Sequence, residues 1–208
     1  MGKGAKIGCG ILIVLAVVAL MAFFLLKNTY NSMVVLDEDV KNSWAQVQNV
    51  LQRRMDLIPN LVETVKGYAT FERETLEAVI NARANATKTQ VNAQDLNSEQ
   101  LQKVMDAQNG LSSALARLMV VVEKYPELKA NENFLRLQDE LAGTENRIAV
   151  ERKRFNDTTR KYNGTLRTFP TVLIAGIFGF QQRPYFEAPQ EAQQAPKVDF
   201  SGMSKKAN

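Results

Sequence analysis

Carboxylates accompany basic residues at helical spacing around residue 70, and they form one group of side chains that could do chemistry. The carboxylates are Glu63, Glu72, Glu74 and Glu77, and the cations beside them are Lys66, Arg73 and Arg83. Paired carboxylates can serve as general acid and base or hold a metal ion. Opposite charges three or four positions apart on a helix more often form ion pairs on a solvated face, and we favour that interpretation.

A second group combines polar residues from two separate stretches of the chain. Its members are Arg53, Arg54, Asp56, Asn60, Glu145, Arg147 and Arg152. Carboxylates and arginines on two facing helices could form one network that binds a ligand or supports hydrolysis. Such a layer can also determine which helices pair, at some cost in stability, and we favour this structural role. The ligand-binding alternative requires an open pocket beside a desolvated Glu145 or Asp56.

The composition removes much other chemistry. The chain of 208 residues has no His and one Cys, so the commonest general base and metal ligand are missing and no thiolate cluster can form. A glycine-rich phosphate-binding loop is also missing. Lys and Arg number 26 against 22 Asp and Glu, a balance too even for a nucleic-acid surface. We therefore predict a protein that is not an enzyme, without catalytic residues, cofactor, metal or nucleic-acid partner.

The N-terminal stretch predicts a membrane anchor. The run from Ile7 to Leu26 holds about twenty residues without a charge, enough at about 1.5 Å per residue to cross a hydrocarbon core of roughly 30 Å. A cleaved signal peptide would have a shorter apolar core and a cleavage site of small residues after it. Lys3 and Lys6 precede the run and only Lys27 follows it directly, which favours a cytoplasmic N-terminus and an extracytoplasmic main part.

Residues 28–167 show helical periodicity. Apolar residues from Val40 to Ala69 alternate spacings of four and three, which predicts a helix that packs on other helices, with Trp44 in the core and its ring N–H bonded to a neighbour. We place a turn at Pro59, since proline is least strained at the first position of a helix. The alternative is a kink in one long helix, because the apolar stripe keeps its phase across Pro59.

In this prediction the helices are of similar length. They cover 31–56, 59–87, 98 to about 125, and a last segment that ends at Asn163. In the last segment apolar residues recur every seven positions, which predicts left-handed coiling against a neighbour; they are Phe134, Leu141, Ile148, Phe155 and Tyr162. A turn at Pro59 makes the helices alternate in direction and brings Asn163 back to the membrane. A kink would instead place the C-terminal apolar run far from it.

A short apolar run from Thr171 to Phe180 follows, and about ten residues are too few to span a bilayer. With basic residues upstream it forms a candidate membrane interface: Phe169, Leu173, Phe178, Phe180, Arg160, Lys161 and Arg167. Such a segment suits the headgroup region of a bilayer, or it caps the open end of the helices, and the residues leave both interpretations open. The remainder, 188–208, is rich in Pro, Gln and Lys, which predicts a disordered tail.

Three separated blocks of the chain have recognisable sequences. They are TYNSMVVLDEDVKNSWAQVQNVLQRRMDLIPNLVETVKGYATFERETLEAVINARA, ENRIAVERKRFNDTTRKYNGTLRTFP and GFQQRPYFEA, in this order. They resemble the LemA family of bacterial membrane-anchored proteins. The polar and aromatic residues that carry the resemblance include Arg53, Arg54, Pro59, Asn60, Glu145, Asn146, Arg147, Phe155, Asn156 and Tyr162. The resemblance implies an N-terminal transmembrane helix followed by an antiparallel four-helix bundle, and a molecular function that is poorly defined.

The predicted divisions are a basic N-terminus (1–6), the anchor (7–27), the helical bundle (28–167), the apolar C-terminal segment (168–187) and the tail (188–208). We expect a single-pass protein of the bacterial inner membrane that acts as a scaffold of the cell envelope. Its partners would be the bilayer and a protein, either another chain or copies of itself. The alternatives are ligand binding or carboxylate-dependent activity in a buried polar site, and membrane remodelling through the C-terminal apolar segment.

Overall fold

The computed structural model describes residues 3–68 and 72–187, and over these ranges the chain is all-helical, as predicted. Its helices are α1 (Lys3–Lys66), α2 (Arg73–Lys88), α3 (Ser98–Val122), α4 (Pro126–Lys129), α5 (Glu132–Leu166) and α6 (Thr171–Phe178). The predicted tail at 188–208 lies outside the described residues, as does Ala69 at the end of the predicted apolar stripe.

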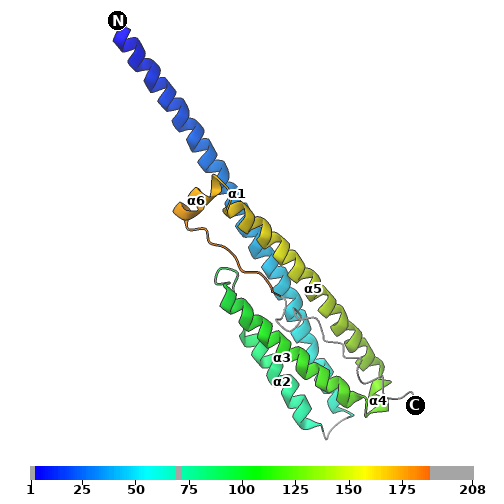
Figure 1. Cartoon of the computed structure of the whole chain (residues 1–208). Coiled ribbons are helices and arrows are strands. Elements are labelled where there is room, and N and C mark those ends of the chain that lie inside the picture. The colour runs from blue at the N-terminus through cyan, green and yellow to red at the C-terminus, as the bar shows by residue number, and fades with distance from the viewer. Residues whose placement is uncertain (1–2, 69–71, 188–208) are drawn as a thin grey trace, which may run out of the picture.

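Helix α1 joins the N-terminal apolar run to the packed part of the molecule without a break (Figure 1). It has 64 residues, and all of its large apolar side chains from Ile11 to Leu26 are exposed. Within the described ranges it is the one helix long and apolar enough to cross a membrane. An exposed apolar surface of this length matches a hydrocarbon core, so the predicted anchor occupies the first part of α1.

The turn that we place at Pro59 is wrong, because Pro59 lies inside α1. A proline has no N–H to donate, so the carbonyl four residues earlier, that of Met55, loses its usual partner. The Arg83 side chain of α2 donates its Nε–H to this oxygen at 2.9 Å. Ile58 and Leu61, on either side of the proline, are fully buried. Burial of the stripe on both sides of Pro59 therefore keeps the helix continuous.

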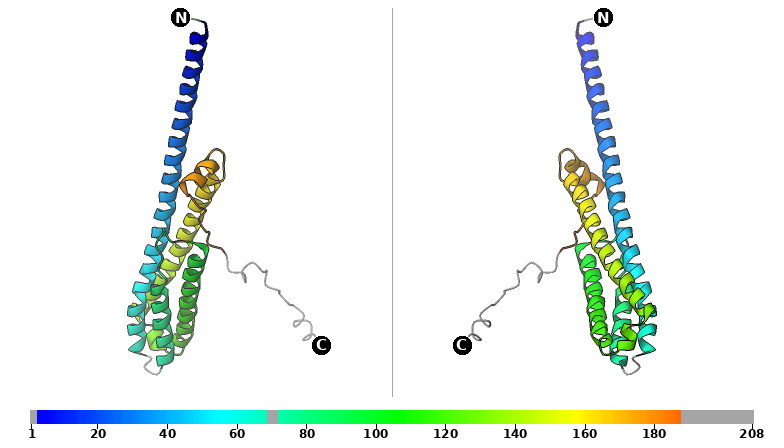
Figure 2. Two further views of the ribbon diagram at one scale, coloured as in Figure 1. Left: turned by 90° about the vertical axis from the view of Figure 1, so that its left-hand side faces the viewer. Right: turned by 90° about the vertical axis from the view of Figure 1, so that its right-hand side faces the viewer.

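The chain reverses after Lys66 instead, and α2 begins at Arg73. In Figures 1 and 2, α2 runs back toward the anchor, α3 leads away from it, and α5 returns beside α1. The alternative of one long helix through Pro59 is therefore confirmed for α1, but its consequence for the C-terminal apolar run is wrong. The Phe178 ring at the end of α6 lies 4.8 Å from the Tyr30 ring of α1, centroid to centroid, one helical turn beyond the apolar run.

The core consists of two apolar clusters stacked along the long axis. The cluster far from the anchor takes side chains from α1 between Met55 and Val65, and from α2, α3, α4 and the start of α5. The cluster near the anchor takes α1 side chains from Met33 to Leu51, with α3 and the second half of α5. Four of the five heptad residues of α5 are buried, and Leu141 is half-buried. The α5 heptad therefore faces both clusters.

The segment after α6 also belongs to the core near the anchor. Gly179 ends α6 with φ of +75°, a left-handed conformation that favours glycine. Residues Phe180 to Glu187, which we call the strap, then run back along α5 without helical structure (Figure 1). Phe186 is buried among the residues of this cluster. The predicted C-terminal segment therefore packs on the helices through its second half.

Candidate functional site

Arg54 lies between the two apolar clusters and is the centre of a small polar layer. Its side chain is 8% exposed, its Nη1 lies 3.1 Å from Oε2 of Glu145, and its Nη2 donates to Ser112 Oγ at 2.8 Å. Burial lowers the pKa of Arg54, and the charge of Glu145 raises it in part. Burial likewise lowers the pKa of Arg152. The charge of Glu145 raises this pKa in part, and the charge of Arg54 lowers it further. One carboxylate thus faces two desolvated guanidinium groups.

The structure brings together only part of the predicted network. Arg54, Glu145 and Arg152 are close, whereas the other predicted members lie on the exposed surface: Arg53, Asp56, Asn60 and Arg147. Arg53 pairs with Glu140 at 3.0 Å, and Asp56 accepts a hydrogen bond from Gln52. Arg53 and Arg147 also line an open hollow of about 430 Å³ between α1 and α5. The polar layer is therefore smaller than the sequence suggests.

The features required for ligand binding at this layer do not coincide. The side chain of Glu145 is 57% exposed, and Asp56 is exposed as well, so desolvation falls on the arginines. The space beside Gln108 and Met55 measures about 20 Å³, which is room for about one water molecule and too little for a larger ligand. Across the described ranges, no three His, Cys, Asp or Glu side chains gather as metal ligands.

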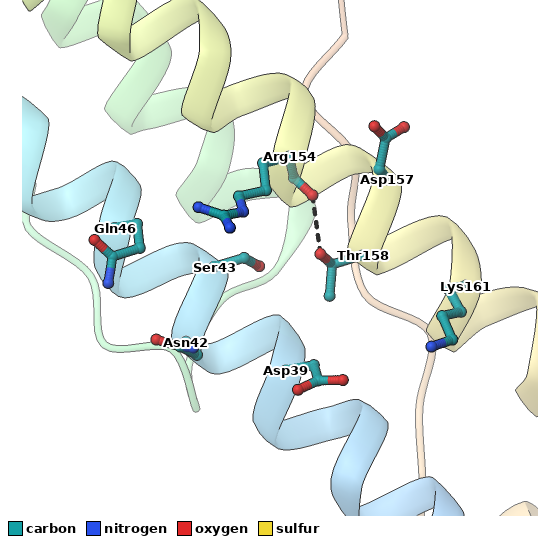
Figure 3. Close-up of a pocket in the computed structure, with 8 residues that line it drawn as sticks. All are labelled: Asp39, Asn42, Ser43, Gln46, Arg154, Asp157, Thr158 and Lys161. Carbon is teal, nitrogen blue, oxygen red and sulfur yellow. Dashed lines mark hydrogen bonds between the residues drawn. The ribbon is translucent and has the colours of Figure 1, made fainter.

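A larger polar hollow of about 560 Å³ lies on the seam between α1 and α5 (Figure 3). Its lining residues are Asp39, Asn42, Ser43 and Gln46 of α1 and Arg154, Asp157, Thr158 and Lys161 of α5. Both signs of charge are present, and Asp157 is paired with Arg160. The hollow is open to solvent, and the mixture of charges favours no single class of small ligand.

The predicted membrane-interface residues divide into two sets at the anchor-proximal end. Phe169, Leu173 and Phe178 are exposed, Phe169 at 81%, and Phe180 is half-buried with its ring 5.8 Å from that of Tyr30. The basic residues Arg160, Lys161 and Arg167 are exposed near the end of α5. Helix α6 therefore combines an exposed apolar surface with a position beside the start of the packed part of α1 (Figure 2).

The strap occupies a surface that the sequence prediction misses, formed by α1, α5 and the α2–α3 loop, which we call the clamp groove. Asn163 donates Nδ2–H to the Arg183 carbonyl at 2.8 Å and accepts the Arg183 N–H at 2.9 Å. Asn156 does the same with Phe186, at 2.9 and 2.8 Å. Each carboxamide thus binds the strap backbone as a neighbouring strand would.

Comparison with known proteins places this arrangement in a family. The LemA family model matches residues 43–200, which contain all of α2 to α6, the strap and most of the clamp groove. The chain belongs to the LemA family.

Named relatives within and around this family cover most of the chain. Magnetosome proteins MamQ 1 and MamQ 2 of Paramagnetospirillum magneticum are each 28% identical to it, over 90% of this chain and 74% of their own length. Magnetosome protein MamQ of Magnetospirillum gryphiswaldense is 27% identical over similar shares. Protein LemA of Metamycoplasma hominis is 22% identical, over 81% of this chain and 73% of its own length.

In this LemA family chain, a sequence signal for the clamp groove does exist. Asn156 and Asn163 are seven positions apart on α5, so they share the period of the apolar heptad, and each follows a heptad residue directly, Phe155 or Tyr162. The heptad residues face the core, so the positions that follow them lie at the border of the buried surface, where both carboxamides are found. Because their partners are backbone atoms of a distant segment, the residue types of that segment give no matching signal.

Proposed function

We propose that this protein is a non-enzymatic scaffold of the bacterial cell envelope, which holds a helical bundle in a fixed orientation on the inner membrane. The observation that carries the proposal is the continuity of α1. The same helix supplies the exposed apolar run and, from Met33 to Val65, buried residues of both core clusters. A helix without a flexible joint transmits the orientation of its membrane part to the domain built around it.

Family membership and the relatives support a membrane-associated role. The MamQ relatives are named as magnetosome proteins, and they match this chain over 89 or 90% of its length. In the proposed arrangement the apolar part of α1 is a single-pass anchor, α1 and α5 coil around each other, and the bundle projects on the extracytoplasmic side. Lys3 and Lys6 before the apolar run support that orientation.

The scaffold proposal is tested by loosening the joint between anchor and domain. Four residues, Gly-Ser-Gly-Ser, are inserted after Asn28, and the matched control carries four alanines at the same place. Proximity labelling from the tagged full chain is compared in cells. We expect the Gly-Ser chain to lose the labelled partners that the alanine chain retains. A monomeric wild-type chain without labelled partners, or identical partners for both insertions, would contradict the scaffold proposal.

Orientation is tested separately with a thiol reagent that does not cross membranes. Cys9 is replaced by Ser, and Val120, an exposed residue of α3, is replaced by Cys. Labelling in intact spheroplasts is expected if the bundle lies outside the cytoplasm. Labelling only after lysis would reverse the proposed orientation.

A second function, binding to the membrane surface through α6, is favoured by one specific observation. Leu173, Ile177 and Phe178 are exposed on α6, which lies one helical turn beyond the apolar run of α1. Apolar side chains at this height meet the boundary between headgroups and acyl chains, and the nearby arginines suit anionic headgroups. In the Cys9→Ser chain, a polarity-sensitive fluorophore on Leu173→Cys is expected to shift to the blue in anionic nanodiscs, whereas one on Val120→Cys is not. Equal spectra at both sites would contradict lipid contact.

A further inference from the structure

The strap is bound to the helices in the manner of a peptide ligand. Between Phe180 and Glu187 it forms no helix, and its backbone is held by side chains of α5. Tyr162 adds a hydrogen bond from its hydroxyl to the Gln181 carbonyl at 2.9 Å. Side chains between the main contacts, including Gln182 and Tyr185, line an open hollow or face solvent. The strap therefore uses its backbone and selected side chains for binding, as a docked segment does.

The spacing of the two asparagines fits an extended chain. Asn156 and Asn163 are seven residues apart on α5, which is about 10.5 Å along a helix. Their partners Phe186 and Arg183 are three residues apart, which is about 10 Å in an extended chain. The match requires the strap to run antiparallel to α5. These carboxamides bind backbone atoms and so accept any residue that can adopt this conformation.

Two side chains of the strap give the groove its sequence preference. Arg183 lies against Asp37, with Nη2 at 2.8 Å and Nε at 3.2 Å from Oδ1, and its Nη1 reaches the Ala93 carbonyl at 3.4 Å. The Asp37 side chain is 15% exposed, so this ion pair is well shielded from water. The charge of Asp37 and the placement of these acceptors therefore favour an arginine at this position.

The second anchor is Phe186, which lies in an aromatic slot. Its ring stacks on Trp44 with a centroid distance of 6.0 Å, and it meets Phe155 edge-on at 5.4 Å. The guanidinium carbon of Arg152 lies 5.2 Å from the Phe186 ring centroid, which adds a cation–π contact. Because Arg152 also faces Glu145 and Arg54, the slot adjoins the polar layer. The two anchors of the strap, Arg183 and Phe186, thus have the spacing Arg-x-x-Phe in an extended chain.

We propose that the clamp groove takes the strap of a second copy of this chain, through Arg183 and Phe186 of that strap, and that this exchange links neighbouring copies in the membrane. The strap of another copy has the same sequence, so it offers the groove the same backbone and both anchors. The chain connects the helical domain to the strap through α6, which packs on α1 and α5 at the membrane-proximal end. Copies anchored through a continuous α1 stand in one orientation, so their grooves and straps lie at the same height.

This proposal rests on the proposed membrane tether. Its test detects contact between two copies of this chain, so it can fail independently of the proximity-labelling test for other protein partners. In a Cys9→Ser background, one tagged copy carries Gln100→Cys and a second, differently tagged copy carries Tyr185→Cys. Both positions line the hollow beside the strap, and neither is an anchor. The copies are co-expressed at full length and treated in membranes with a short bifunctional maleimide. A single chain that carries both cysteines is the positive control, because it shows whether the reagent can bridge the two positions when the strap lies in the groove of its own copy.

We expect a cross-linked heterodimer from the mixed copies, and we expect it to disappear when the Tyr185→Cys copy also carries Arg183→Ala and Phe186→Ala. The matched control replaces Gln100→Cys with Val120→Cys, which lies on α3 away from the groove. No heterodimer, while the double-cysteine chain does cross-link internally, would overturn the exchange. A heterodimer that persists without the two anchors would identify random collision and would also overturn it.

The groove itself is tested with a labelled peptide, FQQRPYFE, that corresponds to residues 180–187. The receptor is the full chain in detergent with Arg183→Ala and Phe186→Ala, which weaken its own strap, and circular dichroism verifies its helix content. We expect saturable binding that weakens about tenfold with Asn156→Ala or Asn163→Ala, each of which removes two hydrogen bonds. A peptide with both anchors replaced by Ala is the matched control. A helical receptor without saturable binding would refute the groove as a peptide site.

Discussion

The hydrogen bond between Arg83 and the Met55 carbonyl leads to a quantitative prediction about how α1 tolerates Pro59. Pro59 deprives this carbonyl of its helical partner, and Arg83 Nε replaces it at 2.9 Å. The Arg83→Met variant keeps an unbranched side chain but leaves the carbonyl without this donor. A hydrogen bond from a charged group is worth about 1.5–3 kcal/mol, so we expect a loss of about 2 kcal/mol in the free energy of unfolding.

The same bond predicts strong coupling between the two sites. In a Pro59→Ala background the new N–H can bond the Met55 carbonyl, so Arg83→Met should then cost less than about 0.5 kcal/mol. The four chains of this double-mutant cycle are unfolded by denaturant at full length in mild detergent, followed by Trp44 fluorescence. Arg73→Met, which affects an exposed ion pair with Glu77 on the same helix, is the matched control and should change little. Additive costs, without coupling, would refute this explanation of the continuous helix.

Three further predictions concern the polar layer, the strap and α6. Glu145→Gln leaves buried Arg54 without its counter-charge and should cost about 1–2 kcal/mol in the same unfolding assay, whereas Arg53→Gln, from the exposed pair with Glu140, should cost under about 0.5 kcal/mol; equal costs would contradict the layer. Burial raises the pKa of Asp37, but hydrogen bonds and charge from Arg183 and Lys41 lower it more, to a net value below the usual 3.8. As pH falls, Asp37 takes up its proton first in the unfolded chain, so the ion pair stabilises the fold fully above about pH 4 and this stabilisation is lost as pH falls through the pKa of the folded state. Asp37→Asn should remove this pH dependence of the free energy of unfolding, and an unchanged pH dependence in the variant would contradict the ion pair. Gly179→Ala should cost about 1 kcal/mol because its φ is +75°, while Gly176→Ala within α6 should be neutral or stabilising, and the reverse order would refute the conformation assigned to the end of α6.

The sequence predicts the helices of this fold well where burial is periodic. The stripe from Val40 onward and the α5 heptad mark faces that are buried in the structure, and Trp44 is in the core with its Nε1–H bonded to the Val91 carbonyl at 2.9 Å, as predicted. Helix α3 begins at Ser98 as expected, with Asn97 as its N-cap. These features depend on local patterns, so one stretch of sequence contains all the information they need.

The errors share a physical cause, which is that the deciding partner is distant in sequence. The position of Pro59 inside α1 depends on Arg83 from another helix, and the unbroken phase of the stripe was the only local sign of it. The roles of Asn156 and Asn163 depend on backbone atoms of the strap, whose residue types do not encode them. The polar layer was overestimated because helical spacing does not show whether arginines such as Arg53 and Arg147 point into the seam or out of it.

The continuity of α1 from the bilayer to the far end of the core is the central claim, and one distance tests it most directly. Spin labels are placed on Lys27→Cys and Lys66→Cys in the Cys9→Ser full chain, reconstituted in lipid nanodiscs. A continuous helix separates these positions by about 58 Å, from a rise of about 1.5 Å per residue. We predict a single narrow distance distribution near that value from pulsed dipolar spectroscopy. A peak near 40 Å, as a reversal at Pro59 would give, or a broad distribution, would contradict the claim.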